Sequence, residues 1–304
     1  MPLGIKPTVD FAFKKIFGSP ENVAALIGLL NAILCLKRPI SSVEILNPFN
    51  YQEFADGKLI VLDVRCRDLD GRLLNVEMQV SVYGGLIERL VYYACSMYVD
   101  QLSAGDNYAL ASPSISICLL SQSLFRETPQ AHHRFQMMDR VSGRELDNAV
   151  EVHTVELPKY NLIEETITAA SKLEQWAFLL LRAQDYDAAT LRRLLPGIEF
   201  DTAIQTIETI SAKTEDKEMY DQREKAQRDY EWALSGAREE GREEGREEGE
   251  QLGLAKGKLV GQIQMLQQLL EEPQGSDEKL HRISLSDLES QLVELQKRLR
   301  ERPA

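Results

Sequence analysis

The chain has 304 residues, of which 43% are hydrophobic and 27% are charged, and its formal net charge is −13. This composition is typical of a soluble globular protein and excludes fibrous and wholly disordered classes. No apolar run reaches the ~18 residues that a membrane-spanning helix needs, and the first residues lack the apolar segment of a secretory signal. We therefore expect a cytoplasmic protein with no membrane partner. Because the total charge is acidic, any DNA-binding surface must be a local basic patch.

The first 163 residues are predicted to form one α/β domain. It begins with two helices, over residues 8–17 and 19–36, and the second is almost wholly apolar from Val23 to Leu36, so it should be buried. The hydrophobic period then changes from 3.6 to 2, which is typical of strands. We expect strands over residues 42–46, 59–67, 72–81, 115–120, 134–138 and 150–157, with a largely buried helix over residues 86–102.

Asp70-Gly71 separates the second and third expected strands, and this dipeptide is a strong signal for a β-hairpin. Side chains alternate along a strand, so the polar residues of the third strand share one face: Asn75, Glu77, Gln79 and Ser81. If residues 69–71 form a three-residue loop with its glycine in the left-handed conformation, Asp63 lies opposite Glu77 and the two carboxylates meet. A two-residue turn would instead place Asp63 opposite Met78, on the wrong face.

Two carboxylates that meet on one face repel each other unless a cation lies between them. Mg²⁺ suits such a place because it prefers oxygen ligands and is commonly held by one or two carboxylates plus a substrate phosphate. A metal ion there could activate a water and stabilise charge on a phosphoryl oxygen, as hydrolysis of a phosphodiester requires. The alternative is that both acids lie on the solvent face of an ordinary hairpin. Alternation by itself does not decide between the two.

Four segments together carry a family resemblance: residues 10–18 (DFAFKKIFG), 62–65 (LDVR), 76–79 (VEMQ) and 88–94 (ERLVYYA). The order is an acid on a helix, acids on two strands, and then a second helix. In this order the chain resembles the recombination-promoting nuclease and transposase family of the PD-(D/E)XK nuclease superfamily. The resemblance covers roughly residues 5–160, and the combination of segments is more specific than any one of them.

The resemblance implies an α/β fold with a PD-(D/E)XK nuclease-like core, a mixed sheet flanked by helices. It also implies a metal-dependent DNA endonuclease that hydrolyses phosphodiester bonds in recombination, mobile elements or defence. Asp63 and Glu77 would bind Mg²⁺, or Mn²⁺ in its place, together with the main-chain carbonyl of Met78. Gln79 takes the position of the motif lysine and would position the attacking water, and Asp10 takes that of the acid on the first helix.

Gln79 departs from the superfamily pattern, because glutamine forms hydrogen bonds but carries no charge. Lys14 is our candidate for the missing catalytic cation, since it follows Asp10 by four residues and so lies on the same helical face. It could instead be solvated or anchor a phosphate. Three cations are predicted to contact DNA unless each pairs with a nearby acid: Lys15, Arg65 and Arg89. The sequence contains no phosphate-binding loop or dinucleotide motif, so no nucleotide cofactor is expected.

From residue 164 onward the sequence shows only helical patterns. We expect a helical region over residues 164–235, a linker with a Gly-Arg-Glu-Glu repeat over residues 236–253 and a helical tail over residues 254–304. Glycine at every fourth residue costs a helix up to ~1 kcal/mol each, so the repeat should be a fraying helix or a flexible linker. Leucines at coiled-coil spacing in the tail indicate either a helical hairpin or a coiled coil between copies. We expect a homo-oligomer through these helices.

Two other functions stay open at this point. The chain could keep a nuclease fold as a catalytically inactive DNA-binding or oligomerising module, which the neutral Gln79 and the acidic net charge favour. It could also act through its helical half, as an oligomerising adaptor with a vestigial nuclease domain.

Overall fold

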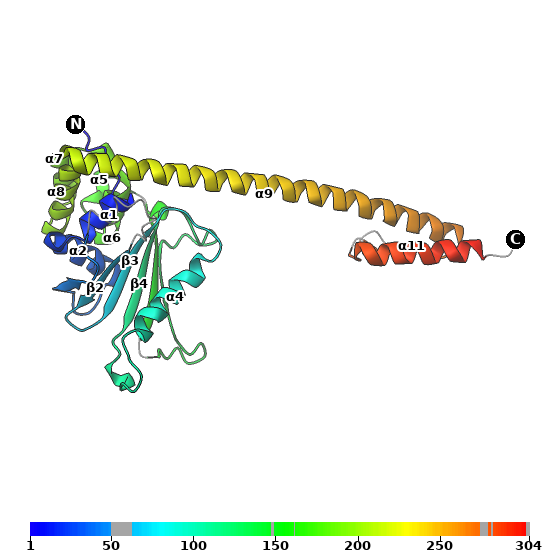
Figure 1. The fold of residues 1–304 in the computed structure, drawn as a ribbon, viewed down its shortest axis with the longest axis horizontal. Coiled ribbons are helices and arrows are strands. Elements are labelled where there is room, and N and C mark those ends of the chain that lie inside the picture. Colours follow the sequence, from blue (N-terminus) through cyan, green and yellow to red (C-terminus); the bar gives the residue numbers. More distant parts are fainter. Residues whose placement is uncertain (50–62, 147–148, 161, 274–278, 281, 302–304) are drawn as a thin grey trace. The chain divides into compact units, whose positions relative to one another are not determined.

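A computed structural model describes residues 1–49, 63–146, 149–160, 162–273, 279–280 and 282–301 (Figure 1). The chain divides into two compact units, residues 1–228 and residues 229–304. The first unit contains all the strands that the structure describes, and the candidate site.

The first unit is built on a six-stranded sheet with the strand order β1-β2-β3-β4-β6-β5. The strands are β1 (Val43–Ile45), β2 (Asp63–Asp68), β3 (Leu73–Gln79), β4 (Ser114–Leu120), β5 (His132–Gln136) and β6 (Val150–Glu156). β3, β4 and β6 are parallel, and the remaining neighbours are antiparallel. The mixed sheet flanked by helices that the sequence predicts is therefore confirmed. Residues 59–62 of the expected second strand lie outside the described residues.

The helices of the first unit follow the expected order closely. They are α1 (Asp10–Phe17), α2 (Val23–Leu34), α4 (Leu86–Val99), α5 (Glu164–Ile167), α6 (Lys172–Arg182), α7 (Ala188–Leu194), α8 (Ile198–Ala212) and the first part of α9 (Thr214–Leu269). Short 3₁₀ turns η1 to η4 cover Pro20–Asn22, Tyr108–Leu110, Leu157–Lys159 and Ala183–Asp185. The expected helix over residues 19–36 thus begins with a 3₁₀ turn, in which Pro20 takes the first position.

The two faces of the sheet are covered by different helices (Figure 1). Val76 and Met78 of β3 point to the larger core, where they pack with α1, α2, α6 and α8. Glu77, which lies between them, points to the opposite face, as strand alternation requires. α4 packs on that face through Leu86, Leu90 and Ala94, which contact Cys118 of β4. The polar face predicted for β3 is therefore the face beneath α4.

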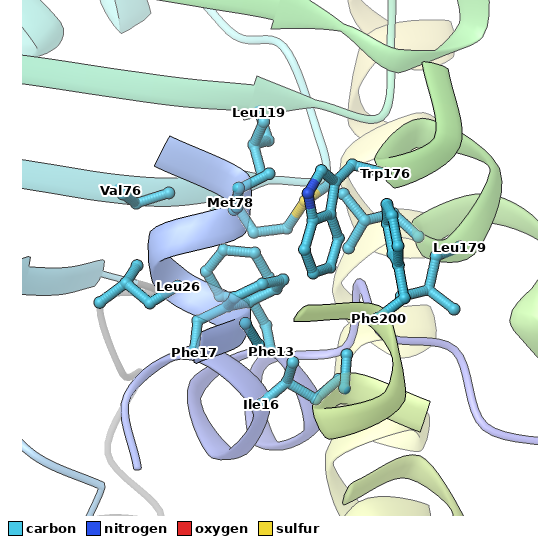
Figure 2. Packing of buried hydrophobic residues seen from close by; sticks show 14 of the residues in the cluster. Phe13, Ile16, Phe17, Leu26, Val76, Met78, Leu119, Trp176, Leu179 and Phe200 are labelled. Atoms are coloured by element: carbon cyan, nitrogen blue, oxygen red, sulfur yellow. The ribbon is translucent and has the colours of Figure 1, made fainter. Parts of the chain in front are cut away.

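The helices after residue 163 share the core of the sheet. The Trp176 ring lies 5.5 Å from the Phe17 ring and 4.6 Å from the Phe200 ring, measured between centroids. These three side chains are fully buried, as Figure 2 shows together with Met78 and Leu119. Residues 164–228 and the sheet therefore belong to one compact unit with a continuous hydrophobic core.

The Gly-Arg-Glu-Glu repeat is helical throughout, as part of α9, and its side chains are exposed. The glycines favour a fraying helix or a flexible linker, whereas the structure has a continuous helix here. Arg246 pairs with Glu243 and Glu250, both at 2.5 Å, and Arg242 pairs with Glu239 at 3.1 Å. Such pairs stabilise a helix by ~0.2–0.5 kcal/mol each, which offsets part of the glycine cost.

The tail forms a helical hairpin within one chain. The end of α9 packs on α11 (Leu285–Arg300) through a small core of its own: Val260, Ile263, Leu280, Leu288 and Leu295. The leucines at coiled-coil spacing thus find partners inside the chain. Met265 and Val293 stay exposed at 65% and 64%.

Among the helices that the structure describes, none is by itself long and apolar enough to cross a membrane. α1 and the segment Pro20–Leu34 meet the length and composition test only as a pair, bent by 67°. Both belong to the core of the first unit.

Candidate active site

The hairpin β2–β3 has the register that brings the two predicted acids together. Gly71 has φ +82°, the left-handed conformation, and the Asp68 amide donates to the Arg72 carbonyl at 3.2 Å to close a three-residue loop. The main chain of Asp63 is then paired with that of Glu77. Both the loop and the register predicted from Asp70-Gly71 are confirmed. Residues directly opposite each other in such a pair have Cβ atoms roughly 4.5–5.5 Å apart.

Glu77 is a buried carboxylate on a central strand, with 2% of its surface exposed. Asn75 Nδ2 donates to Glu77 Oε1 at 3.1 Å, and Arg89 Nη2 on α4 lies 3.3 Å from Glu77 Oε2. A buried carboxylate is tolerated only where hydrogen bonds and charge satisfy it. The solvent-face alternative, in which the acids of the hairpin have no special surroundings, is therefore wrong for Glu77.

Gln79 and Arg89 complete this group. Arg89 Nη2 donates to Gln79 Oε1 at 2.5 Å, and Gln79 Nε2 donates to the Ser81 carbonyl at 2.8 Å. The side chain of Met78 is buried in the opposite core, so only its main-chain carbonyl could serve the site. The structure thus brings together three of the residues predicted from the sequence: Glu77, Gln79 and Arg89.

The chain matches one family model, that of the PD-(D/E)XK nuclease family transposases, over residues 7–237. It belongs to this family. No curated protein and no solved structure gives a significant match. The match spans the first unit from residue 7 to its end, so the helices after residue 163 lie within the matched length.

A PD-(D/E)XK nuclease generally uses divalent metal ions, and the donors of this site suit one. They are the Glu77 carboxylate, a main-chain carbonyl and the Gln79 amide, on a strand whose Glu77 is paired through the main chain with Asp63. Asn75 Oδ1, beside Glu77, is buried and has no hydrogen-bond partner among the described residues. Oxygen atoms of these kinds are the ligands that Mg²⁺ prefers. No cluster of three acidic, histidine or cysteine side chains suited to a metal occurs in the described part of the chain.

The charge of Glu77 affects the pKa of Cys118, its neighbour on β4. Burial is the main cause that raises the pKa of the Cys118 thiol, and the negative charge of Glu77 raises it further, while Arg89 acts in the opposite direction. Cys118 is paired with Glu77 in the sheet. This thiol therefore stays protonated and acts as a small apolar side chain beneath the site.

α1 places two of the other predicted residues, Asp10 and Lys15, against α9. Lys15 Nζ lies 2.6 Å from Asp216 Oδ2, and the Arg223 guanidinium lies 3.7 Å from Asp10 Oδ2. Burial raises the pKa of Asp10, against the opposing charge of Arg223. Lys14 is 4% exposed. Of the predicted DNA contacts, Arg65 is exposed on β2, opposite Asn75, whereas Lys15 is 9% exposed.

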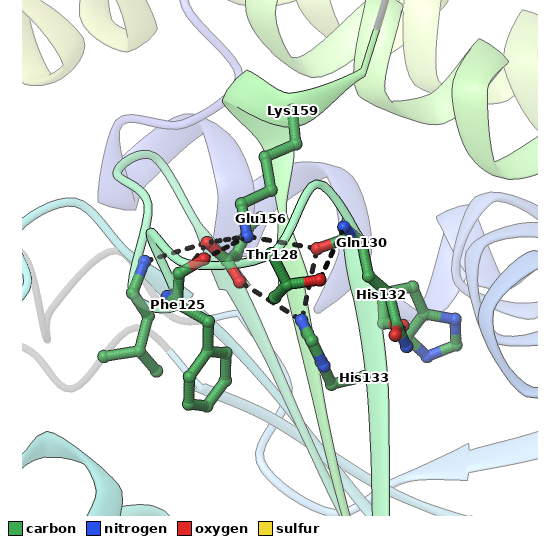
Figure 3. Close-up of polar contacts among 8 residues, drawn as sticks. Phe125, Thr128, Gln130, His132, His133, Glu156 and Lys159 are labelled. Atoms are coloured by element: carbon green, nitrogen blue, oxygen red, sulfur yellow. Dashed lines mark hydrogen bonds and ion pairs between the residues drawn. The ribbon is translucent and has the colours of Figure 1, made fainter.

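The contacts that fix the loop beside the site could not be predicted from the sequence. Glu156 is fully buried; its Oε2 accepts hydrogen bonds from the Leu124 and Phe125 amides at 2.9 and 3.3 Å and pairs with Lys159 Nζ at 2.9 Å (Figure 3). Lys159 also donates to the carbonyls of Phe125 and Gln130. These bonds hold the segment after β4, whose Ser121 amide donates to the Gln79 carbonyl at 3.0 Å. Glu156 shares a face with Gln79 because both are level with Leu120 of β4, and alternation along β6 alone does not give this register.

A second polar cluster joins β5 to β6. Arg134 makes two hydrogen bonds to Glu151, at 2.9 and 2.7 Å, and His153 contacts Glu151 and His132 at 3.2 and 2.9 Å. Burial alone would raise the pKa of Glu151, but the hydrogen bonds from His153 and Arg134 outweigh it and lower the pKa to about 2. Burial, with the neighbouring cations, lowers the pKa of His132 to about 4. The cluster joins the edge strand β5 to the sheet.

Proposed function

We propose that this chain is a Mg²⁺-dependent DNA endonuclease that hydrolyses phosphodiester bonds in recombination, mobile elements or defence. The observation that supports this most directly is the register of the hairpin, which pairs Asp63 with the buried Glu77 in a member of a nuclease-type transposase family. Mn²⁺ is the alternative ion, because it accepts the same oxygen ligands.

In this proposal Asp63 and Glu77 hold the ion with the main-chain carbonyl of Met78. When bound, the ion lowers the pKa of a water and stabilises negative charge on a phosphoryl oxygen. Gln79 positions the attacking water through its amide. The water gives up a proton to solvent as its oxygen attacks phosphorus, the bond from phosphorus to the leaving sugar oxygen breaks, and the leaving oxygen takes up a proton from solvent. One DNA end then carries a phosphate and the other a hydroxyl group.

Asp10 and Lys14 remain proposed contributors from α1, the first as the acid of the first helix and the second as a cation. For DNA contact we propose Arg65, which is exposed, and Arg89, whose side chain is 30% exposed. Lys15 is a weaker candidate because its ammonium group is paired with Asp216.

The test is plasmid cleavage in Mg²⁺ and in EDTA, with the parent chain, Asp63→Ala and Glu77→Gln. Asp70→Ala and Glu44→Gln are matched controls, since Asp70 and Glu44 are acids of the same hairpin and its neighbour with side chains 56% and 70% exposed. We expect cleavage by the parent and the controls in Mg²⁺ only. Equal cleavage by Asp63→Ala would show that the metal assignment is wrong.

A DNA-binding module without hydrolytic activity is the second candidate, and the neutral Gln79 favours it. It predicts that the parent chain shifts DNA in a gel but breaks no strand in Mg²⁺ or Mn²⁺. Because the same samples serve both assays, the two candidates are separated in one experiment.

We also propose a homo-oligomer through the C-terminal helices. Exposed apolar side chains outside the hairpin core support it: Leu252, Leu254, Met265, Leu269 and Val293. Light scattering of the full chain against one that ends near Gly236 tests this. A monomeric mass for the full chain would show that the tail pairs only with itself.

A further inference from the structure

Arg89 is a cation that reaches the candidate site from the first turn of α4. One of its nitrogens, Nη2, contacts both Gln79 Oε1 and Glu77 Oε2, at 2.5 and 3.3 Å. A single guanidinium therefore joins the residue proposed to position water and a residue proposed to bind the ion.

The place of Arg89 is unfavourable for α4 considered alone. A positive charge in the first turn lies at the positive end of the helix dipole, and the N-cap is Gly85, which has no side chain to cap the helix. The guanidinium is nevertheless held in place, with its carbon 5.3 Å from the Tyr83 ring and 5.8 Å from the Tyr93 ring. Contacts with Glu77, Gln79 and two aromatic rings thus offset the dipole.

Arg89 also keeps donors for a further partner. Its buried Nε has no hydrogen-bond partner among the described residues, and the side chain retains 30% exposure. Guanidinium carries five N–H donors and always holds its charge. Such a group is suited to a phosphate oxygen, which it can bind without leaving the site.

We propose that Arg89 is the resident cation of this site: it neutralises Glu77 while no metal is bound, and it supplies to the scissile phosphate the positive charge that Gln79 lacks. This inference rests on the proposed function. It moves the task that we assigned to Lys14 to a residue in direct contact with Glu77 and Gln79.

The proposal predicts two effects of opposite sign. Without Arg89 the Glu77 carboxylate has one competitor fewer, so the affinity for a divalent ion rises. Cleavage falls, because the charge that stabilises the phosphoryl group is lost. A merely structural role would lower both quantities, since a disordered site binds and cleaves less well.

The experiment uses the full chain and Mn²⁺ as the probe, with free Mn²⁺ measured by electron paramagnetic resonance and plasmid cleavage measured in parallel. For Arg89→Met we expect cleavage about 10²-fold slower, as when a preorganised charge-stabilising group is lost. We expect Mn²⁺ binding about two- to fivefold tighter, the range for a part-exposed ion pair. Arg182→Met is the matched control, because Arg182 is 55% exposed on α6.

Rescue is the decisive arm. In the Arg89→Met background, Gln79→Lys places a cation at the residue that Arg89 contacts. We expect this double variant to cleave at least about tenfold faster than Arg89→Met. Arg89→Lys should lie between parent and Arg89→Met. If Arg89→Met does not fold, the cleavage rates of Arg89→Lys, which keeps the positive charge, and Arg89→Gln, which removes it, are compared in its place.

Failure is distinguishable from failure of the proposed function. A parent chain that binds Mn²⁺ and cleaves, with Arg89→Met that binds no more tightly or is not rescued by Gln79→Lys, overturns the role of Arg89 alone. Both the role of Arg89 and the proposed function are overturned if the parent chain cleaves no DNA and binds Mn²⁺ no more tightly than Glu77→Gln does.

Discussion

Lys15 offers a test in which a DNA contact and a buried ion pair predict different results. Its ammonium group lies 2.6 Å from Asp216, and the two side chains are 11% and 0% exposed. The ammonium also lies 5.5 and 5.6 Å from the Phe11 and Phe49 rings. Lys15→Met removes the positive charge that faces the buried Asp216 carboxylate.

Removing one partner of a buried pair costs about 3–5 kcal/mol. For a unit of this size, each kcal/mol shifts the Tm by roughly 2–4 °C. We therefore expect Lys15→Met to lower the Tm by about 6–20 °C. Because two apolar residues can replace a buried pair at little cost, Lys15→Met combined with Asp216→Leu should recover most of the loss.

The assays are thermal unfolding followed by circular dichroism, and DNA affinity by fluorescence anisotropy at a temperature where all variants are folded. Lys37→Met is the control, since Lys37 is exposed just after α2. The reasoning is refuted if Lys15→Met keeps the parent Tm within about 2 °C and loses DNA affinity. Lys15 would then face DNA and not Asp216.

Further outcomes follow from the packing and charges of the first unit. Trp176→Ala should cost about 3–5 kcal/mol in urea unfolding, whereas Trp232→Ala, at a side chain 83% exposed, should leave the urea midpoint unchanged. The pKa of Glu151 is about 2 in the fold against 4.5 ordinarily, so its stabilisation is complete above pH 4.5 and is lost as the pH falls toward 2. Glu151→Gln should flatten this acid dependence of the urea midpoint. Lys159→Met should speed hydrogen exchange in residues 121–131 before it affects β4, and uniform exchange rates would contradict the loop-holding role of Glu156.

Local rules predicted the centre of the site. The Asp70-Gly71 loop and the alternation of β3 depend on neighbouring residues, so the pairing of Asp63 with Glu77 could be worked out from sequence and is found in the structure. The burial of Met78 on the opposite face follows from the same alternation. These features need no knowledge of how distant segments pack.

The partners of the acids could not be predicted in this way. Arg89 reaches Glu77 only because α4 crosses back over the polar face of the sheet, and helical spacing does not give the rotation of a helix on a sheet. Lys15 and Asp216 are far apart in the chain, so their pairing depends on how α9 packs against α1. The place of Trp176 in the core of the sheet likewise depends on packing between distant segments. The helical state of the repeat depends on its continuity with the flanking parts of α9.

The length of the turn at Gly71 constrains the chemistry of the whole hairpin. A slip of the β2–β3 pairing by one residue would put position 63 on the opposite face of the sheet from Glu77, although every acid would still be present in the sequence. The closure of the loop between Asp68 and Arg72 therefore matters to the site as much as the presence of the acids does. A homologue in which this register has slipped, with its acidic residues intact, is expected to lack the proposed metal site.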